Sequence, residues 1–370
     1  MKKIVQLSIL VILLEIAVIG FNFNFSSNRV GTKRLAETTL IDLTPTRIAS
    51  PTPTIILKPP PQSKKLSGGI QMFQTYNNCG PASLSMALSY FGVDISQKIL
   101  GDELRPFQNP NGDNDDKSVT LEELTKKAAE LGFTTYHRPN GNIELIKQFI
   151  TYEMPIVVRT TTKPAEDIGH FRIIKGYDDV NRVLIQDDSL QGKNLEYTYD
   201  NFYLLWKVFN FEYLVLVPTE KAGVAKAILG ENLDEQTAWA IAKDNALSQL
   251  STNPEDIDAR FNLSIAYYHL GNYQKSIDEY ELIENKLPFR TLWYQIEPIL
   301  AYYKVGNYEK VIAITDGILE NGNRAYSEVY IVRGDIFQLQ GNSELALQEY
   351  QKAVYYNKNL NVAKEKLEMF

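Results

Sequence analysis

Three glycine–asparagine turns recur in the C-terminal part of the chain at a constant interval. Gly271, Gly306 and Gly341 are each followed by Asn, and each lies 35 residues from the next (306 − 271 and 341 − 306). Apolar and small residues flank each turn at helical spacing, which predicts pairs of helices. Because a unit of this size buries its apolar face only against its neighbours, the section from 233 to 370 is expected to fold as an all-α solenoid.

This section resembles the tetratricopeptide repeats, a helix–turn–helix family with a period of about 34 residues. The resemblance implies repeats at about 257–290, 292–325 and 327–360. A degenerate cap helix is expected before them, at 236–250.

Four side chains are candidates for a binding groove on the concave face of these repeats, where aromatic anchors often dominate binding. They are Tyr268, Trp293, Ile296 and Tyr303. Packing in the interior of the repeats is the alternative for the same residues. A protein partner is therefore expected at the repeats, and these side chains are its first candidate contacts.

The single cysteine, Cys79, lies directly before a predicted helix. Pro81 suits the first helical position, apolar residues follow at helical spacing, and Gly92 ends the helix. A thiol at a helix N-terminus is favoured as the thiolate by the helix dipole and the free N–H groups. Gln74, five residues earlier, is placed to supply an amide donor beside the sulfur. A buried, inert cysteine is the alternative, but the turn-forming neighbours favour a reactive one.

A thiolate nucleophile needs a base, and the base needs a group that orients it. His170 begins an apolar strand, and a second strand ends at Asp187. A hairpin through 177–181 would bring these two ends together, so that the carboxylate holds the imidazole. The other histidines are weaker candidates, because His137 precedes Arg138-Pro139 at a strand end and His269 lies in a repeat helix.

These motifs together resemble those of the papain-like cysteine peptidases, in particular the bacteriocin-processing peptidases that cut after double-glycine leaders and their peptidase-like relatives. By position, the resemblance implies that Cys79 is the nucleophile, His170 the base and Gln74 the oxyanion donor. Asp187 would orient His170. Asp188 follows it directly and is the alternative, although Asp187 is preferred.

The segment 68–219 is predicted to be an α+β domain, because helices come first and consecutive strands later. One of the helices begins with the capping box Thr120–Glu123, and Tyr213–Val217 completes the sheet. The resemblance implies a papain-like arrangement, in which an N-terminal helix carries the cysteine and an antiparallel sheet carries the histidine and the aspartate.

Two further segments precede this domain. Residues 1–25 begin with two lysines and continue as a mostly apolar run, which predicts an N-terminal membrane anchor; a cleaved signal peptide is the alternative. Either one places the rest of the chain outside the cytoplasm. The Pro/Thr/Ser-rich composition of 26–67 predicts an extended linker.

The composition argues against several classes of partner. A formal net charge of −7 disfavours nucleic acid. One cysteine excludes a Cys-based zinc site, and the three histidines form no His-x-x-x-His pair, so no metal or cofactor is expected. The acid-rich stretch 108–116 is interpreted as a solvated loop rather than a calcium site, because no bidentate glutamate follows at the required position.

The sequence therefore favours an extracytoplasmic cysteine peptidase whose repeats recruit a peptide substrate or a protein partner. Two alternatives stay open. The peptidase-like domain is inactive in a repeat-based binding protein, or the thiol transfers its acyl group to an amine, as in a transpeptidase or acyltransferase. Hydrolysis and transfer require the same residues, so the sequence does not separate them.

Overall fold

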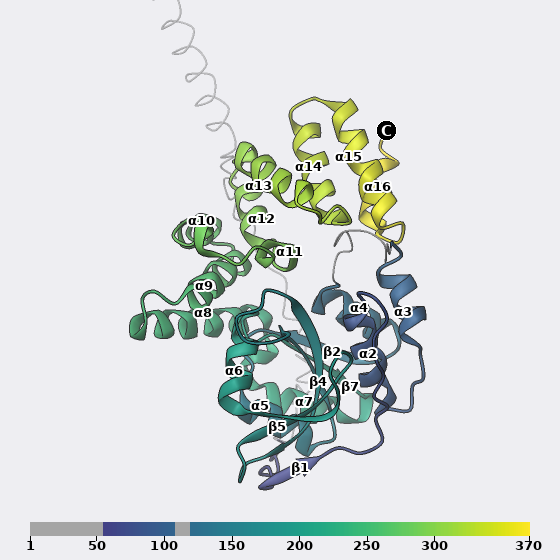
Figure 1. Ribbon diagram of the computed structural model, residues 1–370, viewed down its shortest axis with the longest axis vertical. Helices are drawn as coiled ribbons and strands as arrows, with labels where there is room; N and C mark the ends of the chain where they lie inside the picture. Colours follow the sequence, from purple (N-terminus) through teal and green to yellow (C-terminus); the bar gives the residue numbers. More distant parts are fainter. Residues whose placement is uncertain (1–54, 108–118) are drawn as a thin grey trace, which may run out of the picture. The chain divides into compact units, whose positions relative to one another are not determined.

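The computed structural model describes residues 55–107 and 119–370, and it shows an α+β domain followed by helical repeats, as predicted (Figure 1). The predicted anchor at 1–25, most of the linker and the acid-rich stretch 108–116 lie outside the described residues. Among the helices within these two ranges, none combines the length and the apolar character needed to cross a membrane.

A seven-stranded antiparallel sheet forms the centre of the first domain. Six strands follow the order β2-β7-β3-β4-β5-β6, and β1 also pairs with β4. The last strand in sequence, β7, therefore lies inside the sheet between β2 and β3. The strands are β1 (Ser63–Lys65), β2 (Thr134–Arg138), β3 (Ile156–Thr161), β4 (Gly169–Asp178), β5 (Val183–Asp188), β6 (Gly192–Thr198) and β7 (Tyr213–Val217).

Helices cover both faces of this sheet because the side chains of its central strands alternate between two apolar cores. In β7, Leu214 and Leu216 join the core beneath α2 and α4, whereas Val215 and Val217 join the core beneath α5, α6 and α7. The predicted capping box begins α4, with Thr120 and Glu123 bonded reciprocally. The helices of this domain are α2 (Cys79–Ser89), α3 (Gln97–Leu104), α4 (Leu121–Glu130), α5 (Ile143–Thr151), α6 (Tyr199–Lys207) and α7 (Ala222–Leu229).

The folded domain begins earlier than the sequence predicted, because residues assigned to the linker join the sheet. β3 pairs with β4 only as far as Ile174, which leaves the edge of Gly176–Asp178 open, and β1 pairs there. Leu66 is buried, and the hydroxyl of Tyr177 donates to the carbonyl of Pro61 over 2.8 Å. The open edge of β4 offers unpaired backbone N–H and C=O groups. Hydrogen bonding to them orders residues 63–65, although their composition predicted an extended linker.

The repeats contain helix pairs joined at the predicted glycines. Gly271, Gly306 and Gly341 have φ of 74°, 80° and 76°, which glycine adopts without strain. The predicted cap corresponds to α8. The helices are α8 (Glu235–Thr252), α9 (Ile257–His269), α10 (Tyr273–Glu281), α11 (Thr291–Tyr294), α12 (Glu297–Lys304), α13 (Tyr308–Glu320), α14 (Ser327–Leu339), α15 (Ser343–Tyr356) and α16 (Asn361–Leu367).

The candidate groove residues pack on the interior of the repeats. Trp293 is 6% exposed within the repeat core, so the expectation that it anchors a partner on the surface is wrong. Tyr268, Ile296 and Tyr303 are partly buried against the same core. The apolar surface of these side chains is buried in contacts between adjacent helices. This favours the alternative that they pack in the interior of the repeats.

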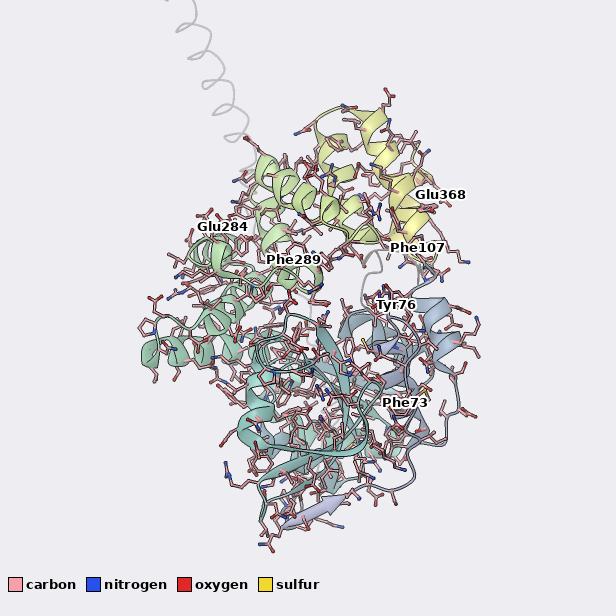
Figure 2. The ribbon with its side chains drawn as sticks, viewed as in Figure 1. Phe73, Tyr76, Phe107, Glu284, Phe289 and Glu368 are labelled. Atoms are coloured by element: carbon pink, nitrogen blue, oxygen red, sulfur yellow. The ribbon has the colours of Figure 1, made fainter. Side chains whose placement is uncertain are left out.

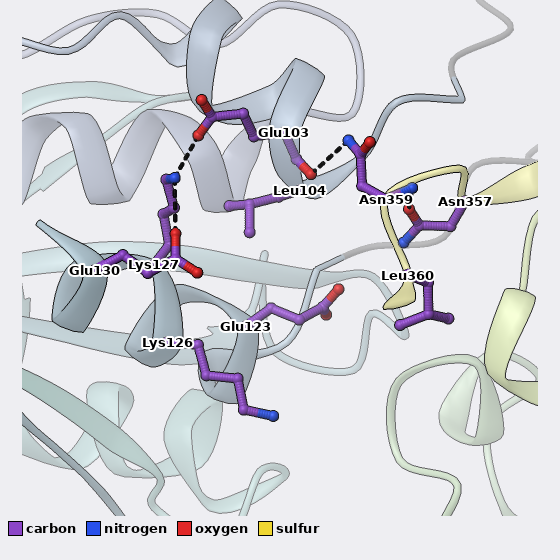
Figure 3. Close-up of a pocket in the computed structure, with 9 residues that line it drawn as sticks. All are labelled: Glu103, Leu104, Glu123, Lys126, Lys127, Glu130, Asn357, Asn359 and Leu360. Atoms are coloured by element: carbon purple, nitrogen blue, oxygen red, sulfur yellow. Dashed lines mark hydrogen bonds and ion pairs between the residues drawn. The ribbon is translucent and has the colours of Figure 1, made fainter. Parts of the chain in front are cut away.

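Several contacts join the repeats to the α+β domain. Asn359 donates to the backbone carbonyls of Asp102 and Glu103, at the end of α3 (Figure 3). Elsewhere Arg290 pairs with Asp167 at 2.7 Å. The repeats therefore contact both the α3 end and the β3–β4 loop of the first domain.

Candidate active site

Cys79 is buried and is the first residue of α2, which begins two residues before the predicted start at Pro81. The first helical bond after Asn78 runs from the N–H of Ala82 to the Asn78 carbonyl, at 2.8 Å. The N–H of Cys79 therefore precedes the helical ladder. The thiol lies at the positive end of the helix dipole, where a thiolate is stabilised.

Gly80 allows the cysteine to sit close to the strand that carries His170. A Cβ at Gly80 would lie 2.1 Å from Cγ2 of Val119 and 3.4 Å from Cε2 of Phe171. The backbone after the nucleophile is thus packed directly against the neighbour of His170. This close approach is possible only without a side chain.

We predict that Gly80→Ala destabilises the fold by about 1–3 kcal/mol, because the added methyl group overpacks this contact. Equilibrium unfolding in urea measures the change. Gly317→Ala is the matched control, since a Cβ at that helical glycine has no atom within 4 Å, and it should stabilise by about 0.5–1 kcal/mol. Equal effects of the two substitutions would contradict the packing argument.

His170 pairs with Asp188. Its Nε2 lies 2.9 Å from Oδ1 of Asp188, and both side chains are buried. With Nε2 engaged by the carboxylate, Nδ1 is the ring nitrogen left to face Cys79. The described structure therefore brings together Cys79, His170 and Asp188.

Asp187, the preferred candidate for orienting His170, is not its partner. Its carboxylate pairs with Nζ of Lys175 at 2.5 Å and accepts from the N–H of Asn194 at 2.9 Å. The predicted hairpin forms, with Asp178 opposite Val183. The prediction was wrong about the register in which β4 pairs with β5.

A β-bulge at Lys175 explains this correction. Gly176 faces Ile185, but Ile174 faces Gln186, so Lys175 is an extra residue in β4. Continuing the register of the hairpin end without a bulge would place Asp187 on the face of His170. Because one extra residue exchanges the two faces, Arg172 instead faces Asp188, which then shares its face with His170.

Arg172 is a second partner of Asp188 that the sequence analysis missed. Its Nη1 lies 2.8 Å from Oδ2 of Asp188, and both side chains are fully buried. Its Nε donates to Oγ1 of Thr160 at 2.9 Å, and Nη2 donates to the carbonyl of Thr162 at 2.7 Å. These bonds fix the carboxylate that holds His170. A charged residue within the apolar run of β4 was the available signal.

The electrostatics of the site favour a thiolate and a protonated imidazole. Burial alone would raise the pKa of Cys79, but the hydrogen bond and charge of His170 lower it below its ordinary value, with smaller contributions from Arg105 and Arg159. Burial alone would lower the pKa of His170, but its bonds to Asp188 and Cys79 raise it to about 9. The two groups thus stabilise each other in their charged forms.

Gln74 lies in the segment that leads to Cys79 and is held by Ser189, the residue after Asp188. Its N–H donates to the Ser189 carbonyl, and its Oε1 accepts from the Ser189 hydroxyl, both at 2.8 Å. These bonds fix the amide plane and leave Nε2 as a donor. The side chain therefore retains the group that an oxyanion donor requires.

The other two histidines bind elsewhere. Nε2 of His137 lies 2.9 Å from Glu212, and Glu122 lies on its other side. His269 stacks on Trp239, with ring centroids 3.8 Å apart. Neither contacts the described Cys79–His170 pair.

Comparisons with known proteins found similarities to parts of this chain. Residues 58–214 match the Peptidase_C39 like family, whereas a search of curated proteins found no match. A C39-like peptidase from Bacillus anthracis is 17% identical, over 42% of this chain and 98% of its own, with a TM-score of 0.37. The peptidase domain of Streptococcus ComA, a bifunctional ABC transporter, is 20% identical over 41% and 100%, with a TM-score of 0.34. A tetratricopeptide repeat protein from Parabacteroides merdae is 22% identical over 39% and 60%, with a TM-score of 0.31.

Proposed function

Because residues 58–214 form a domain of the Peptidase_C39 like family, we propose that this chain is a cysteine peptidase that hydrolyses peptide bonds through Cys79, His170 and Asp188. The observation that carries the proposal is the buried Cys79–His170–Asp188 arrangement, in which the pKa of the thiol is lowered and that of the imidazole is raised. This is the charge state that a thiolate nucleophile and its acid partner require.

In the proposed acylation step, Sγ of Cys79 attacks the carbonyl carbon of the substrate and the carbonyl becomes an oxyanion. The amide of Gln74 and the backbone N–H of Cys79 donate hydrogen bonds to that oxygen. His170 gives its proton to the leaving amine as the C–N bond breaks. The product is a thioester on Cys79.

Water then attacks the thioester, with His170 as the base that takes its proton. The C–S bond breaks and the free acid leaves with the oxygen of that water. Asp188 stabilises the imidazolium that recurs in both steps. An amine in place of water would give transfer instead, and adding amines to the assay distinguishes the two products.

The pH dependence of Cys79 alkylation tests this proposal. A free thiol titrates near pH 8.5, so its labelling slows below that pH. Because the pKa of Cys79 is lowered, labelling of the full chain should stay fast as the pH falls below 8.5. Peptide hydrolysis should decline as the pH rises through about 9, where His170 loses the proton that the leaving amine needs.

The result that overturns the proposal is an ordinary thiol profile combined with no cleavage of a diverse peptide library. Cys79 is the only cysteine, so the label reports on one site without further substitutions. An inactive peptidase-like domain would then be the better description.

Two exposed aromatic side chains in the segment before Cys79, Phe73 and Tyr76, support contact with an extended substrate (Figure 2). We further propose that the repeats take part in recruiting that substrate or a protein partner. Phe289, also exposed, lies in the repeat section next to α11.

The proposed location is outside the cytoplasm, with residues 1–25 as the anchor. The supporting observation is the apolar run behind two lysines. Fractionation of cells that produce the full chain should place it with the membranes, and removal of residues 1–25 should release it. Recovery of the full chain in the cytoplasm would contradict this proposal.

A further inference from the structure

A cavity of about 260 Å³ lies between the β3–β4 loop, the end of α6 and the repeats. It is smaller than the roughly 300–1,000 Å³ of pockets for whole small molecules, so it suits a single long side chain. Its apolar walls include Phe209 from the first domain and Tyr294 from α11. Further apolar residues complete these walls, and four side chains of the lining carry carboxylate or amide hydrogen-bond acceptors: Glu166, Asp167, Asp258 and Gln295.

Two of these acceptors have no partner among the described residues. Gln295 is 4% exposed; its Nε2 donates to the carbonyl of Val208, and its Oε1 accepts nothing. The carboxylate of Asp258 makes no hydrogen bond or ion pair within the described chain, since the neighbouring Lys207 pairs with Asp256. Burial raises the pKa of Asp258.

The charge of the lining is acidic. Glu166 accepts from the hydroxyl of Thr162 and pairs with Lys163 at 3.4 Å, and Asp167 pairs with Arg290, whose side chain neutralises it. Asp258 is the carboxylate left without a counter-ion. The buried Oε1 of Gln295 costs free energy as long as it has no donor. A cation with several N–H groups would donate to it and also pair with the partly buried carboxylate of Asp258.

The cavity lies beside the proposed catalytic residues. Thr161, in its wall, pairs in register with Gly169, the residue before His170. A Cβ at Gly169 would lie 3.2 Å from the ring of Tyr294, another wall residue. A peptide bound at Cys79 therefore has this cavity within reach of a side chain near its scissile bond.

We propose that this cavity is a substrate subsite for a basic side chain, lysine or arginine, near the scissile bond. The proposal rests on the peptidase function proposed above. The ammonium or guanidinium group donates to the Asp258 carboxylate and the Gln295 amide oxygen, and its methylene groups pack against the wall formed by Phe209 and Tyr294. The repeats supply Asp258, Tyr294 and Gln295, so they determine cleavage specificity as part of the site.

The test uses the full chain and a diverse peptide library whose cleavage products are sequenced. Cleavage should cluster beside lysine or arginine. A matched pair of peptides, with lysine or its uncharged near-isostere norleucine at that position, should differ by about tenfold to a hundredfold in kcat/KM. Cleavage of both peptides at equal rates would overturn the subsite while leaving the peptidase function intact.

Asp258→Asn should raise KM for the lysine peptide and leave kcat/KM for the norleucine peptide unchanged. The ratio of kcat/KM between the two peptides should therefore fall toward one. Asp244→Asn removes the same charge from an exposed position on α8 and should keep the preference. Gln295→Met is the second variant, in case Asp258→Asn unfolds. A preference that survives both Asp258→Asn and Gln295→Met would overturn the proposal.

If the wild-type chain cleaves neither these peptides nor any member of the library, and Cys79 has an ordinary thiol profile, the peptidase function fails and the cavity is tested by binding. Calorimetry with Cys79→Ser and the two uncleaved peptides then decides. Tighter binding of the lysine peptide supports the subsite, and equal affinities overturn it.

Discussion

Replacing His170 with Ala is expected to lower kcat/KM for peptide hydrolysis by about 10⁴-fold or more. The substitution removes the proton donor for the leaving amine and the cation that lowers the pKa of Cys79. Labelling of Cys79 below pH 8.5 should slow in parallel, because the thiol reverts toward its ordinary pKa. Both effects are measured on the same preparation, by initial rates and by alkylation kinetics.

His137→Ala is the matched control for this substitution. Like His170, His137 is bonded to carboxylates and has its pKa raised to about 9, against the effect of its burial, by Glu122 and Glu212. Its removal should cost stability but leave the alkylation profile of Cys79 unchanged. Wild-type hydrolysis in His170→Ala, or equal losses in the two variants, would show that His170 is not the base.

Replacing Asp188 with Asn is expected to lower kcat/KM by about 10²- to 10⁴-fold, because the neutral amide no longer stabilises the imidazolium of His170. The same change leaves the guanidinium of Arg172 buried without its counter-ion. Breaking a buried pair in this way costs about 3–5 kcal/mol of stability. Rates per folded molecule and urea unfolding curves separate the two effects.

Asp187→Asn distinguishes the two neighbouring carboxylates. It leaves Lys175 buried without its ion-pair partner, so its loss of stability should resemble that of Asp188→Asn. Its kcat/KM per folded molecule should stay near that of the wild type, because Asp187 does not contact His170. If activity fell with Asp187→Asn and survived Asp188→Asn, the orienting role assigned to Asp188 would be wrong.

Local patterns were sufficient for the elements that depend on nearby residues. The helix at Cys79, the capping box of α4 and the turn of the β4–β5 hairpin are all stabilised by bonds within a few residues, and each formed within two residues of the predicted position. The repeat turns are equally local, since Gly271 and its two counterparts adopt positive φ by themselves. Interactions between residues this close in sequence can be predicted from the periodicity of the chain.

Long-range packing decided the features that the sequence did not reveal. β1 joined the sheet because an edge of β4 was open, which no property of residues 63–65 indicates. Trp293 and Tyr294 are adjacent in sequence, yet Trp293 enters the repeat core whereas the carbonyl of Tyr294 accepts a hydrogen bond from Arg159 of β3. Such placements depend on which surfaces meet.

By itself, the sequence determined the α+β domain and the all-α repeats, because both follow from local spacing. It also singled out Cys79 and His170 as candidate catalytic residues, and the structure brings the two side chains together. The choice between Asp187 and Asp188 was made by the tertiary structure alone. One extra residue in β4, Lys175, shifts the register of the hairpin and exchanges the faces of its partner strand. The side-chain period of a strand is two residues, so a shift of one residue is enough to bring Asp188, and not Asp187, to His170.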